Sequence, residues 1–245
     1  MTTRPKVLTV IPAFNEEESL PGVLAEIRSA VPRARVLVVD DGSVDRTSAV
    51  AAAAGVDVLT LPFNLGVGGA LRAGFRYAER FGYEQMVQVD ADGQHDPSAI
   101  PAMLDLLAGA DLVVGARFAG QPGYEVGGVR RMVMVVLARS LSRRTGAALT
   151  DTTSGFRAFG PRAIALFARD YPAEYLGDTV EALLMAARAR LTVVQVPVVM
   201  RRRTAGTPSH SALRAAILLG RTLPAFVLPR PRASRTAVRS RGDAR

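Results

Sequence analysis

Five short apolar runs alternate with helix-like segments over the first 114 residues, and this alternation constrains the fold more than any other feature of the chain. The runs are mostly apolar and rich in β-branched residues, which is typical of parallel strands buried on both faces. We expect strands at 6–11, 36–39, 56–60, 86–89 and 111–114, and helices at 17–30, 46–54, 66–80 and 98–108. The pattern predicts an α/β fold with a Rossmann-like, mostly parallel sheet and helices on both faces.

Polar side chains lie at or shortly after the carboxyl ends of three of these strands. The residues at the three carboxyl ends are Asn15 with Glu16, Asp40 with Asp41, and Asp90 with Asp92. In such sheets ligands bind outside the carboxyl ends of the strands, so these residues are expected to converge on one edge. Converging carboxylates repel one another unless a cation or a donor-rich ligand lies among them. Asp-x-Asp suits a hard divalent ion such as Mg²⁺ or Mn²⁺, Gln94 offers a further oxygen, and His95 is expected to be a solvated turn residue.

Composition narrows the classes of partner. The chain has 245 residues, a formal charge of +9 and no cysteine, so disulfides and thiolate metal sites are excluded. Lys6 is the only lysine, and the remaining positive charge is arginine, which suits planar anions such as phosphates. Nucleic acid, phospholipid and phosphorylated small molecules are all compatible with this charge. A nucleic-acid-binding module has little support, because the C-terminal tail carries much of the charge and no aromatic residue interleaves with it.

Motifs of other enzyme classes are incomplete. Gly66, Gly68 and the following residues resemble a dinucleotide loop, but the third glycine of that motif would fall at Leu71. There is no G-K-[ST] loop, and Ser43 and Ser154 lack the G-x-S-x-G setting of a nucleophilic serine. A sugar-phosphate nucleotidyltransferase would use a similar sheet and metal. It stays an alternative of another class, although its glycine-rich, basic N-terminal loop is missing.

Six sequence blocks in one order resemble the family 2 glycosyltransferases with a GT-A fold. The blocks are VIPAFNEEESL (10–20), VVDDGSVDRT (38–47), NLGVGGALRAGF (64–75), VQVDADGQHDP (87–97), VGARF (114–118) and DTTSGFRAF (151–159). The chain is most similar to the branch of dolichyl-phosphate mannose synthase and its bacterial polyprenyl-phosphate relatives. The resemblance covers about residues 6–210 and implies a catalytic domain over 1–210. Apolar side chains at helical spacing predict an amphipathic helix at 211–228, and clustered arginines predict a basic, flexible tail at 229–245.

The resemblance implies inverting transfer of a hexose from a nucleotide-diphosphate sugar, linked to GDP or UDP. It assigns donor binding to Pro12, Asn15, Glu16, Asp40, Asp41, Gly68 and Asp90, with Asp41 alternatively a cap of the next helix. It assigns the metal, Mg²⁺ or Mn²⁺, to Asp90, Asp92 and Gln94. A metal in that place bridges the diphosphate and neutralises the charge that develops on the leaving group.

The resemblance also implies an acceptor side. Contacts to acceptor or phosphate are assigned to Arg131, Ser154, Arg157 and Arg202, and catalytic roles to Asp92, Arg117 and Glu181. The favoured acceptor is a polyprenyl phosphate of the dolichyl type, which carries its own nucleophilic oxygen. A hydroxyl of a glycan or glycolipid is the alternative, and it would need a carboxylate base such as Asp151 or Glu181.

The expected location is the cytoplasm, with peripheral attachment to the inner face of the cell membrane. No segment has the roughly 20 apolar residues of a spanning helix. The tail from Arg230 onward holds six arginines and one acid, Asp243, so it suits an anionic membrane surface. A membrane protein is a further expected partner, and nucleic acid is not.

Overall fold

The computed structural model of the protein describes residues 5–117, 128–172 and 177–201. These residues form a seven-stranded sheet in the order β3-β2-β1-β4-β6-β5-β7. The strands are β1 (Val7–Ala13), β2 (Arg35–Asp40), β3 (Asp57–Thr60), β4 (Gln85–Gln88), β5 (Leu112–Arg117), β6 (Arg157–Phe159) and β7 (Val193–Val198). The first four pair in parallel, as do β5 and β7, whereas β6 is antiparallel to both of its neighbours. The prediction of a mostly parallel sheet is confirmed.

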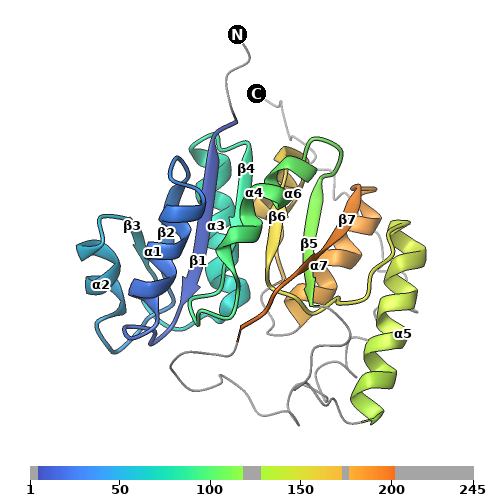
Figure 1. Cartoon of the computed structure of the whole chain (residues 1–245), viewed down its shortest axis with the longest axis horizontal. Helices are drawn as coiled ribbons and strands as arrows, with labels where there is room; N and C mark the ends of the chain where they lie inside the picture. Colours follow the sequence, from blue (N-terminus) through green and yellow to red (C-terminus); the bar gives the residue numbers. More distant parts are fainter. Residues whose placement is uncertain (1–4, 118–127, 173–176, 202–245) are drawn as a thin grey trace, which may run out of the picture.

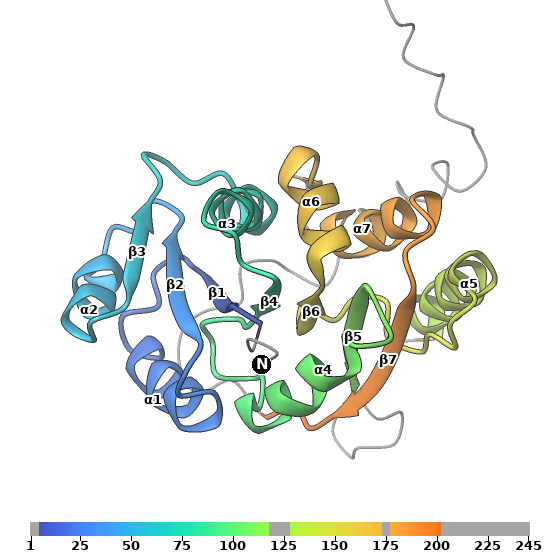
Figure 2. The same cartoon turned by 90° about the horizontal axis from the view of Figure 1, so that it is seen from above.

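Helices cover both faces of this sheet. They are α1 (Leu20–Ala30), α2 (Thr47–Ala53), α3 (Val67–Arg80), the 3₁₀ turn η1 (Pro97–Ala99), α4 (Ile100–Leu106), α5 (Gly128–Thr145), α6 (Pro161–Arg169) and α7 (Gly177–Arg188). Figure 2 shows α1 and α4 on one face and α3, α6 and α7 on the other. Each face has its own apolar cluster, because alternate residues of a strand point to opposite faces: Leu8 and Val10 belong to one cluster, and Ile11 belongs to the other.

Helices α5 and α7 correspond to helices expected at 129–142 and 178–188, but three other elements were not predicted from the sequence and several boundaries differ. The missed elements are β6, α6 and β7. Strand β6 is only three residues long and lies inside the block 151–159, so no alternating pattern marks it. Helix α1 begins at Leu20 instead of residue 17, since the residues before it form a turn that bonds to the loop after β2.

An aromatic cluster fixes the position of β6. The rings of Phe75 in α3 and Phe159 in β6 lie edge to face, with centroids 4.8 Å apart, and Phe167 and Tyr171 pack on the same ring of Phe75. All four side chains are buried, and such pairs add to the stability gained from apolar burial. The cluster holds β6 between β4 and β5, so the residues just before β6 lie at the carboxyl end of β4.

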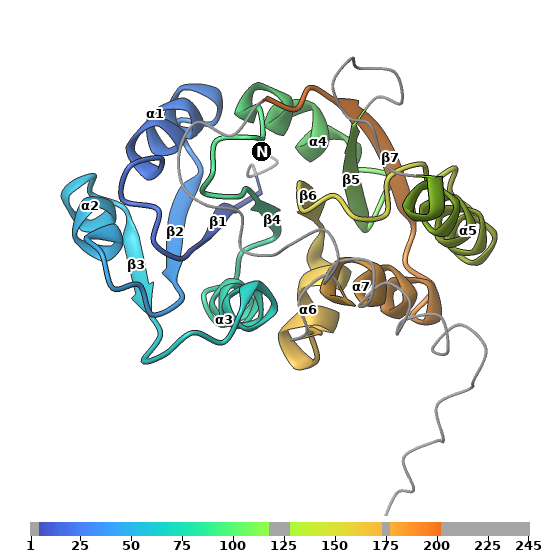
Figure 3. The same cartoon turned by 90° about the horizontal axis from the view of Figure 1, so that it is seen from below.

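The carboxyl ends of the parallel strands meet at one edge. Strand β1 points downward in Figure 1, and Figure 3 looks onto the lower edge, where β1, β2 and β4 end. The polar residues that follow these strands lie on this edge, as expected for a ligand site in an open α/β sheet. Within the described ranges, no helix combines the length and the apolar character needed to cross a bilayer.

Candidate active site

The loops after β1 and β2 are joined by hydrogen bonds. Asn15 has a left-handed backbone, with φ of 55°. Its backbone N–H donates to Ser43 Oγ at 2.9 Å, and its side-chain Oδ1 accepts from the N–H of Val44 at 2.9 Å. The first and second sequence blocks therefore form one continuous surface, on which the Asn15 side chain holds the neighbouring loop.

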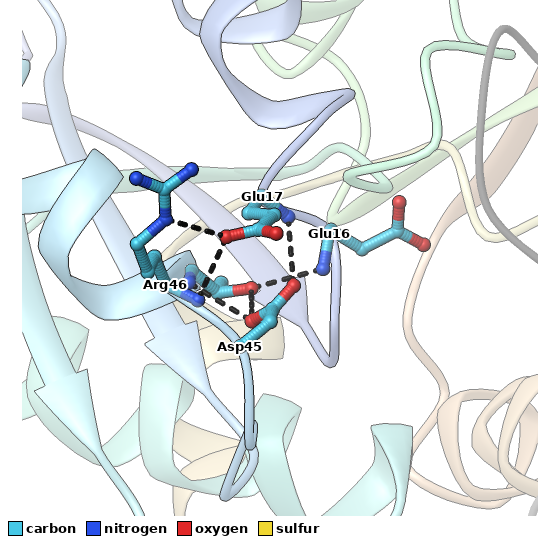
Figure 4. A network of polar contacts seen from close by, with 5 residues as sticks. Glu16, Glu17, Asp45 and Arg46 are labelled. Carbon is cyan, nitrogen blue, oxygen red and sulfur yellow. Dashed lines mark hydrogen bonds and ion pairs between the residues drawn. The ribbon is translucent and has the colours of Figure 1, made fainter.

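A denser polar network lies beside this contact (Figure 4). Glu17 N–H donates to Asp45 Oδ2 at 3.1 Å, and Glu17 Oε2 accepts from Arg46 Nε at 3.1 Å. The backbone N–H of Glu16 donates to Thr47 Oγ1 at 2.9 Å, while in Figure 4 the Glu16 carboxylate points away from the other residues drawn. Burial raises the pKa of Asp45, but hydrogen bonds from Thr47 and Glu17 outweigh it and the pKa is lowered. The network fixes the backbone around Glu16.

Asp40 and Asp41 are both buried and have different partners. Asp40 is 2% exposed and accepts from the N–H of Ser43 at 2.9 Å and from the Ser48 hydroxyl. Asp41 accepts from the backbone N–H groups of Leu65 and Gly66, each at 2.8 Å. Burial raises the pKa of Asp41, against the effect of these two bonds. Asp41 therefore anchors the entry to α3 and not the next helix along the chain, which corrects that alternative.

Two further donor residues lie on the same side of the sheet. Pro12 is half-buried near the end of β1, where it pairs with Val39 of β2. Gly68 is buried in the first turn of α3, close in sequence to the two amides that Asp41 holds. The structure thus brings the first three blocks together, and donor contact by their residues stays a prediction.

The acids predicted to hold a metal follow β4. The Asp90 carboxylate is 37% exposed, whereas Asp92 is 7% exposed and accepts from the N–H of Gln94 at 3.0 Å. Gln94 Nε2 donates to the carbonyl of Arg201 at 3.4 Å, so its amide oxygen is the atom that the prediction would assign to the metal. Two carboxylates and an amide oxygen fit a hard divalent cation. No cluster of three or more acidic or histidine side chains suited to a metal occurs in the described part of the chain, so ligand oxygens would complete the shell.

The expectation of a solvated His95 is wrong. His95 is 3% exposed, its ring stacks on Phe156 with centroids 4.8 Å apart, and its Nδ1 accepts from the backbone N–H of Asp90 at 3.0 Å. It also forms an isolated bridge with Met200, just after β7. A single histidine in a turn gives no sequence signal for such burial, which depends on strands distant in the sequence.

The block 151–159 lies against the metal acids. Because β6 runs antiparallel to β4, the residues before β6 meet those after β4. A Cβ atom placed on Gly155 would lie 3.1 Å from Asp90 Oδ2 and 3.1 Å from Gln88 Nε2. Only glycine leaves this space free, so Gly155, part of the predicted acceptor-side block, lies against Asp90 together with Gln88, which the sequence reasoning did not assign.

Arg157 and Ser154 face the interior of the protein. Arg157 is fully buried, and its guanidinium donates to the carbonyl of Ser154 at 2.8 Å and to that of Thr152 at 3.1 Å. Ser154 is 2% exposed and its Oγ accepts from the N–H of Phe156. The predicted contact of these side chains with acceptor phosphate does not agree with this burial. Their positions favour a role in holding the loop that carries Gly155.

The remaining predicted residues are placed only in part. Arg117 ends β5 and Arg131 lies in α5, but their side chains are outside the described part of the structure. Glu181 is half-buried in α7, and Asp151 is 5% exposed and accepts from Thr153 at 3.0 Å. Arg202, the segment 211–228 and the tail 229–245 lie outside the described residues, as does the end of the predicted domain 1–210.

Comparison with known proteins agrees with this geometry. The model of the family "Glycosyl transferase family 2" matches residues 9–171. The chain is 40% identical to undecaprenyl-phosphate mannosyltransferase of Micrococcus luteus over 84% of this chain and 88% of that protein. It is also 40% identical to polyprenol monophosphomannose synthase of Mycolicibacterium smegmatis, over 64% of this chain and 63% of that protein.

A solved structure supports the fold independently. Glucosyl-3-phosphoglycerate synthase from Mycobacterium tuberculosis, in complex with Mn²⁺, UDP-glucose and phosphoglyceric acid, superposes with a TM-score of 0.71. The identity is 23%, over 92% of this chain and 81% of the other. Fold and site together define a glycosyltransferase with the GT-A fold. The chain belongs to glycosyl transferase family 2, as its sequence blocks predicted.

Proposed function

We propose that this enzyme moves a hexose from a nucleotide-diphosphate sugar to a polyprenyl phosphate. The observation that carries the proposal is the contact between two distant blocks, in which Gly155 lies against the half-exposed carboxylate of Asp90. This contact joins Asp90, which is proposed to face the donor diphosphate, to the loop before β6, which is predicted to face the acceptor. The names of the two relatives that are 40% identical support a polyprenyl phosphate as acceptor and make mannose the first sugar to test.

In the proposed reaction, an oxygen of the lipid phosphate attacks the anomeric carbon of the donor sugar. The bond from that carbon to the diphosphate oxygen breaks, and the nucleoside diphosphate leaves with the bonding electron pair. The acceptor oxygen is already anionic, so no protein base is needed. This agrees with the burial of Asp151, whose carboxylate already accepts from Thr153.

Asp90, Asp92 and Gln94 would hold Mg²⁺ or Mn²⁺. A bound divalent ion neutralises charge on the diphosphate as it leaves. The protein itself fixes the metal loop: Asp92 binds the N–H of Gln94, and Gln94 bonds to the backbone of Arg201 at the end of β7. Arg117, Arg131 and Arg202 are proposed to act on phosphate, and Glu181 to support the acceptor side.

The test is a panel of GDP- and UDP-linked hexoses crossed with short polyprenyl phosphates, with release of nucleoside diphosphate and formation of glycolipid both measured. We expect product with one donor and a lipid phosphate, loss of activity in excess chelator, and a loss of orders of magnitude in Asp92→Asn at an unchanged melting temperature. Transfer to a glycan hydroxyl but not to lipid phosphate would contradict the proposed acceptor. Full activity in chelator would contradict the metal.

We further propose that the enzyme works as a peripheral protein on the inner face of an anionic membrane, held by the arginine tail. Each basic residue near such a surface contributes about 1 kcal/mol, and salt weakens this attraction. The protein should therefore sediment with anionic vesicles at low salt and less so at high salt. Deletion of 230–245 should reduce binding sharply, and equal binding by the shortened protein would rule out the tail as the tether.

A further inference from the structure

The two oxygens of the Asp90 carboxylate each face a nitrogen atom of the protein. Gln88 Nε2 lies 3.4 Å from Oδ1, and His95 Nε2 lies 3.6 Å from Oδ2. The carboxylate nevertheless remains 37% exposed. Asp90 is therefore approached from inside the protein on both oxygens while part of it stays open to a ligand.

The orientation of the His95 ring is fixed independently of Asp90's side chain. Its Nδ1 accepts the backbone N–H of Asp90 at 3.0 Å, so the neutral ring carries its hydrogen on Nε2, the nitrogen that faces Oδ2. The ring also stacks on Phe156, at an interplanar angle of 13°. The ring therefore cannot turn its donor away from the carboxylate without losing the hydrogen bond from the Asp90 N–H.

Gln88 is a polar residue in a place where an apolar one would pack. It ends β4, is 2% exposed, and its Oε1 meets no hydrogen-bond donor within the described part of the chain. A buried, unpaired amide oxygen costs about 1–3 kcal/mol, so packing alone does not explain a glutamine here. Its other end supplies the reason, because Nε2 is directed at Asp90.

Gly155 completes the enclosure. A Cβ at this position would stand 3.1–3.3 Å from both Asp90 oxygens and from Gln88 Nε2, which is tighter than ordinary contact. The glycine thus allows the loop before β6 to close on the carboxylate without displacing it.

We propose that Gln88 and His95 are positioning residues that hold the Asp90 carboxylate in one orientation for the divalent cation. This inference rests on the proposed function, since it assumes that Asp90 binds a metal. Groups behind a metal ligand fix its orientation, and their loss commonly weakens metal binding by ten- to a hundredfold. Neither residue would touch the cation or the substrate, so their effect would appear first in metal affinity.

The test measures binding of Mn²⁺ in the presence of inorganic pyrophosphate, by electron paramagnetic resonance of the free ion. No sugar donor is needed, so the readout does not depend on turnover. Gln88→Met keeps the volume and removes the amide, and we expect the Mn²⁺ dissociation constant to rise by about tenfold. Gln85→Met is the matched control on the same strand: Gln85 donates to the carbonyl of Leu104, and its loss should leave Mn²⁺ binding unchanged.

Two variants of His95 separate positioning from packing. In the His95→Asn variant, the side-chain oxygen can still accept a hydrogen bond from the backbone N–H of Asp90, but no donor lies near Oδ2. Mn²⁺ should therefore bind about tenfold more weakly. In the His95→Gln variant, the side-chain amide nitrogen reaches the place of the histidine Nε2. This variant should recover part of the Mn²⁺ affinity. Melting temperatures show whether each variant is folded. Equal losses in the two variants would assign His95 to packing alone and overturn its positioning role.

The outcomes distinguish this inference from the proposed function. One outcome would overturn only the positioning roles. In it, the wild-type protein binds Mn²⁺ and Asp92→Asn does not, while Gln88→Met and His95→Asn bind Mn²⁺ as tightly as wild type. Absence of Mn²⁺ binding in wild type would overturn both the metal site and the positioning roles. Weaker binding in Gln88→Met and His95→Asn, with Gln85→Met unchanged, supports the inference.

Discussion

Arg201 Nη1 lies 2.7 Å from Glu26 Oε2, and this ion pair ties the segment just after β7 to α1. The other end of the same guanidinium lies 3.1 Å from Asp96 Oδ1, two residues after Gln94, the last of the predicted metal ligands. Burial raises the pKa of Asp96, but hydrogen bonds from Ser98 and the charge of Arg201 lower it below its usual range. The first arginine of the basic run 201–203 is thus already engaged by acids of the protein.

Arg201 and Arg202 are therefore expected to behave differently on substitution. Arg202→Ala removes a proposed phosphate ligand and should lower kcat/KM by about ten- to a hundredfold, the range for a hydrogen bond to a charged group. Arg201→Ala breaks exposed ion pairs, which contribute little, and should lower kcat/KM less than Arg202→Ala does. Steady-state kinetics with both substrates varied gives the comparison. The reverse order would show that Arg201 has the greater role in phosphate binding.

Gly155→Ala tests the contact on which the proposed function depends. The backbone of Gly155 has no left-handed φ, so alanine is allowed and its effect comes from the Cβ alone. The added atom, 3.1 Å from Asp90 Oδ2, forces the carboxylate to move by a few tenths of an ångström. A displacement of 1 Å costs about a hundredfold in rate, so we expect a loss of roughly tenfold in kcat.

Gly109→Ala is the matched control for this experiment. A Cβ on Gly109 would meet no atom within 4 Å, so kcat should stay at the wild-type value. Melting temperatures of both variants should remain close to wild type. Wild-type kcat in Gly155→Ala would show that the Asp90 carboxylate does not need this space.

Arg157→Met tests whether the buried arginine stabilises its loop or binds the acceptor. The substitution leaves the carbonyls of Ser154 and Thr152 without the donors that they now have, so the free energy of unfolding should fall by roughly 2–4 kcal/mol. Denaturant unfolding measures this loss. In the fraction that stays folded, KM for the acceptor should change little. Unchanged stability together with a much higher acceptor KM would restore the predicted role in phosphate binding.

The parallel half of the fold could be predicted from the sequence because its strands are mostly apolar and end in turn residues. Val36 to Val39 are all buried, as a strand covered on both faces requires. Strand β6 could not be predicted, since three residues are too few to show a period and its pairing depends on β4, some 70 positions earlier. No local sequence signal indicated that β6 lies between β4 and β5 in the sheet.

The candidate site divides in the same way. Asp90 and Asp92 could be proposed as metal ligands from the sequence because two acids two positions apart at a strand end have few structural explanations. The group behind them was missed: Gln88 and His95 lie within five residues of Asp90, but their roles follow from side-chain directions set by Gly155 and Phe156. For Arg157 the prediction assigned a ligand contact where the structure shows burial. An arginine in a sequence motif suggests phosphate binding, and only the fold shows that its side chain is buried.

An ion pair at the opposite end of the sheet should give part of the acid sensitivity of the fold without affecting catalysis. Arg35 and Asp57 are the first residues of β2 and β3, and their side chains form two bonds of 2.6 and 2.7 Å. Tyr77 also donates to Asp57. The Arg35 guanidinium, assisted by Tyr77, holds the pKa of Asp57 below its usual range in spite of partial burial.

A lowered pKa in the folded state means that ionised Asp57 stabilises the fold at pH values above its unfolded pKa of about 3.9. This stabilisation is lost as the pH falls through the pKa of Asp57 in the folded state.

Asp57→Asn removes the charge but keeps an acceptor for Tyr77. Its free energy of unfolding should be lower than that of wild type at pH 7, by a small amount because Arg35 is largely exposed to solvent. The two proteins should converge in acid, which denaturant unfolding between pH 7 and pH 3 can follow. Turnover at pH 7 should be unchanged, since the pair lies at the starts of the strands and the site at their ends. A difference in stability that is constant over this pH range would show that the pair acts through packing and not through the charge of Asp57.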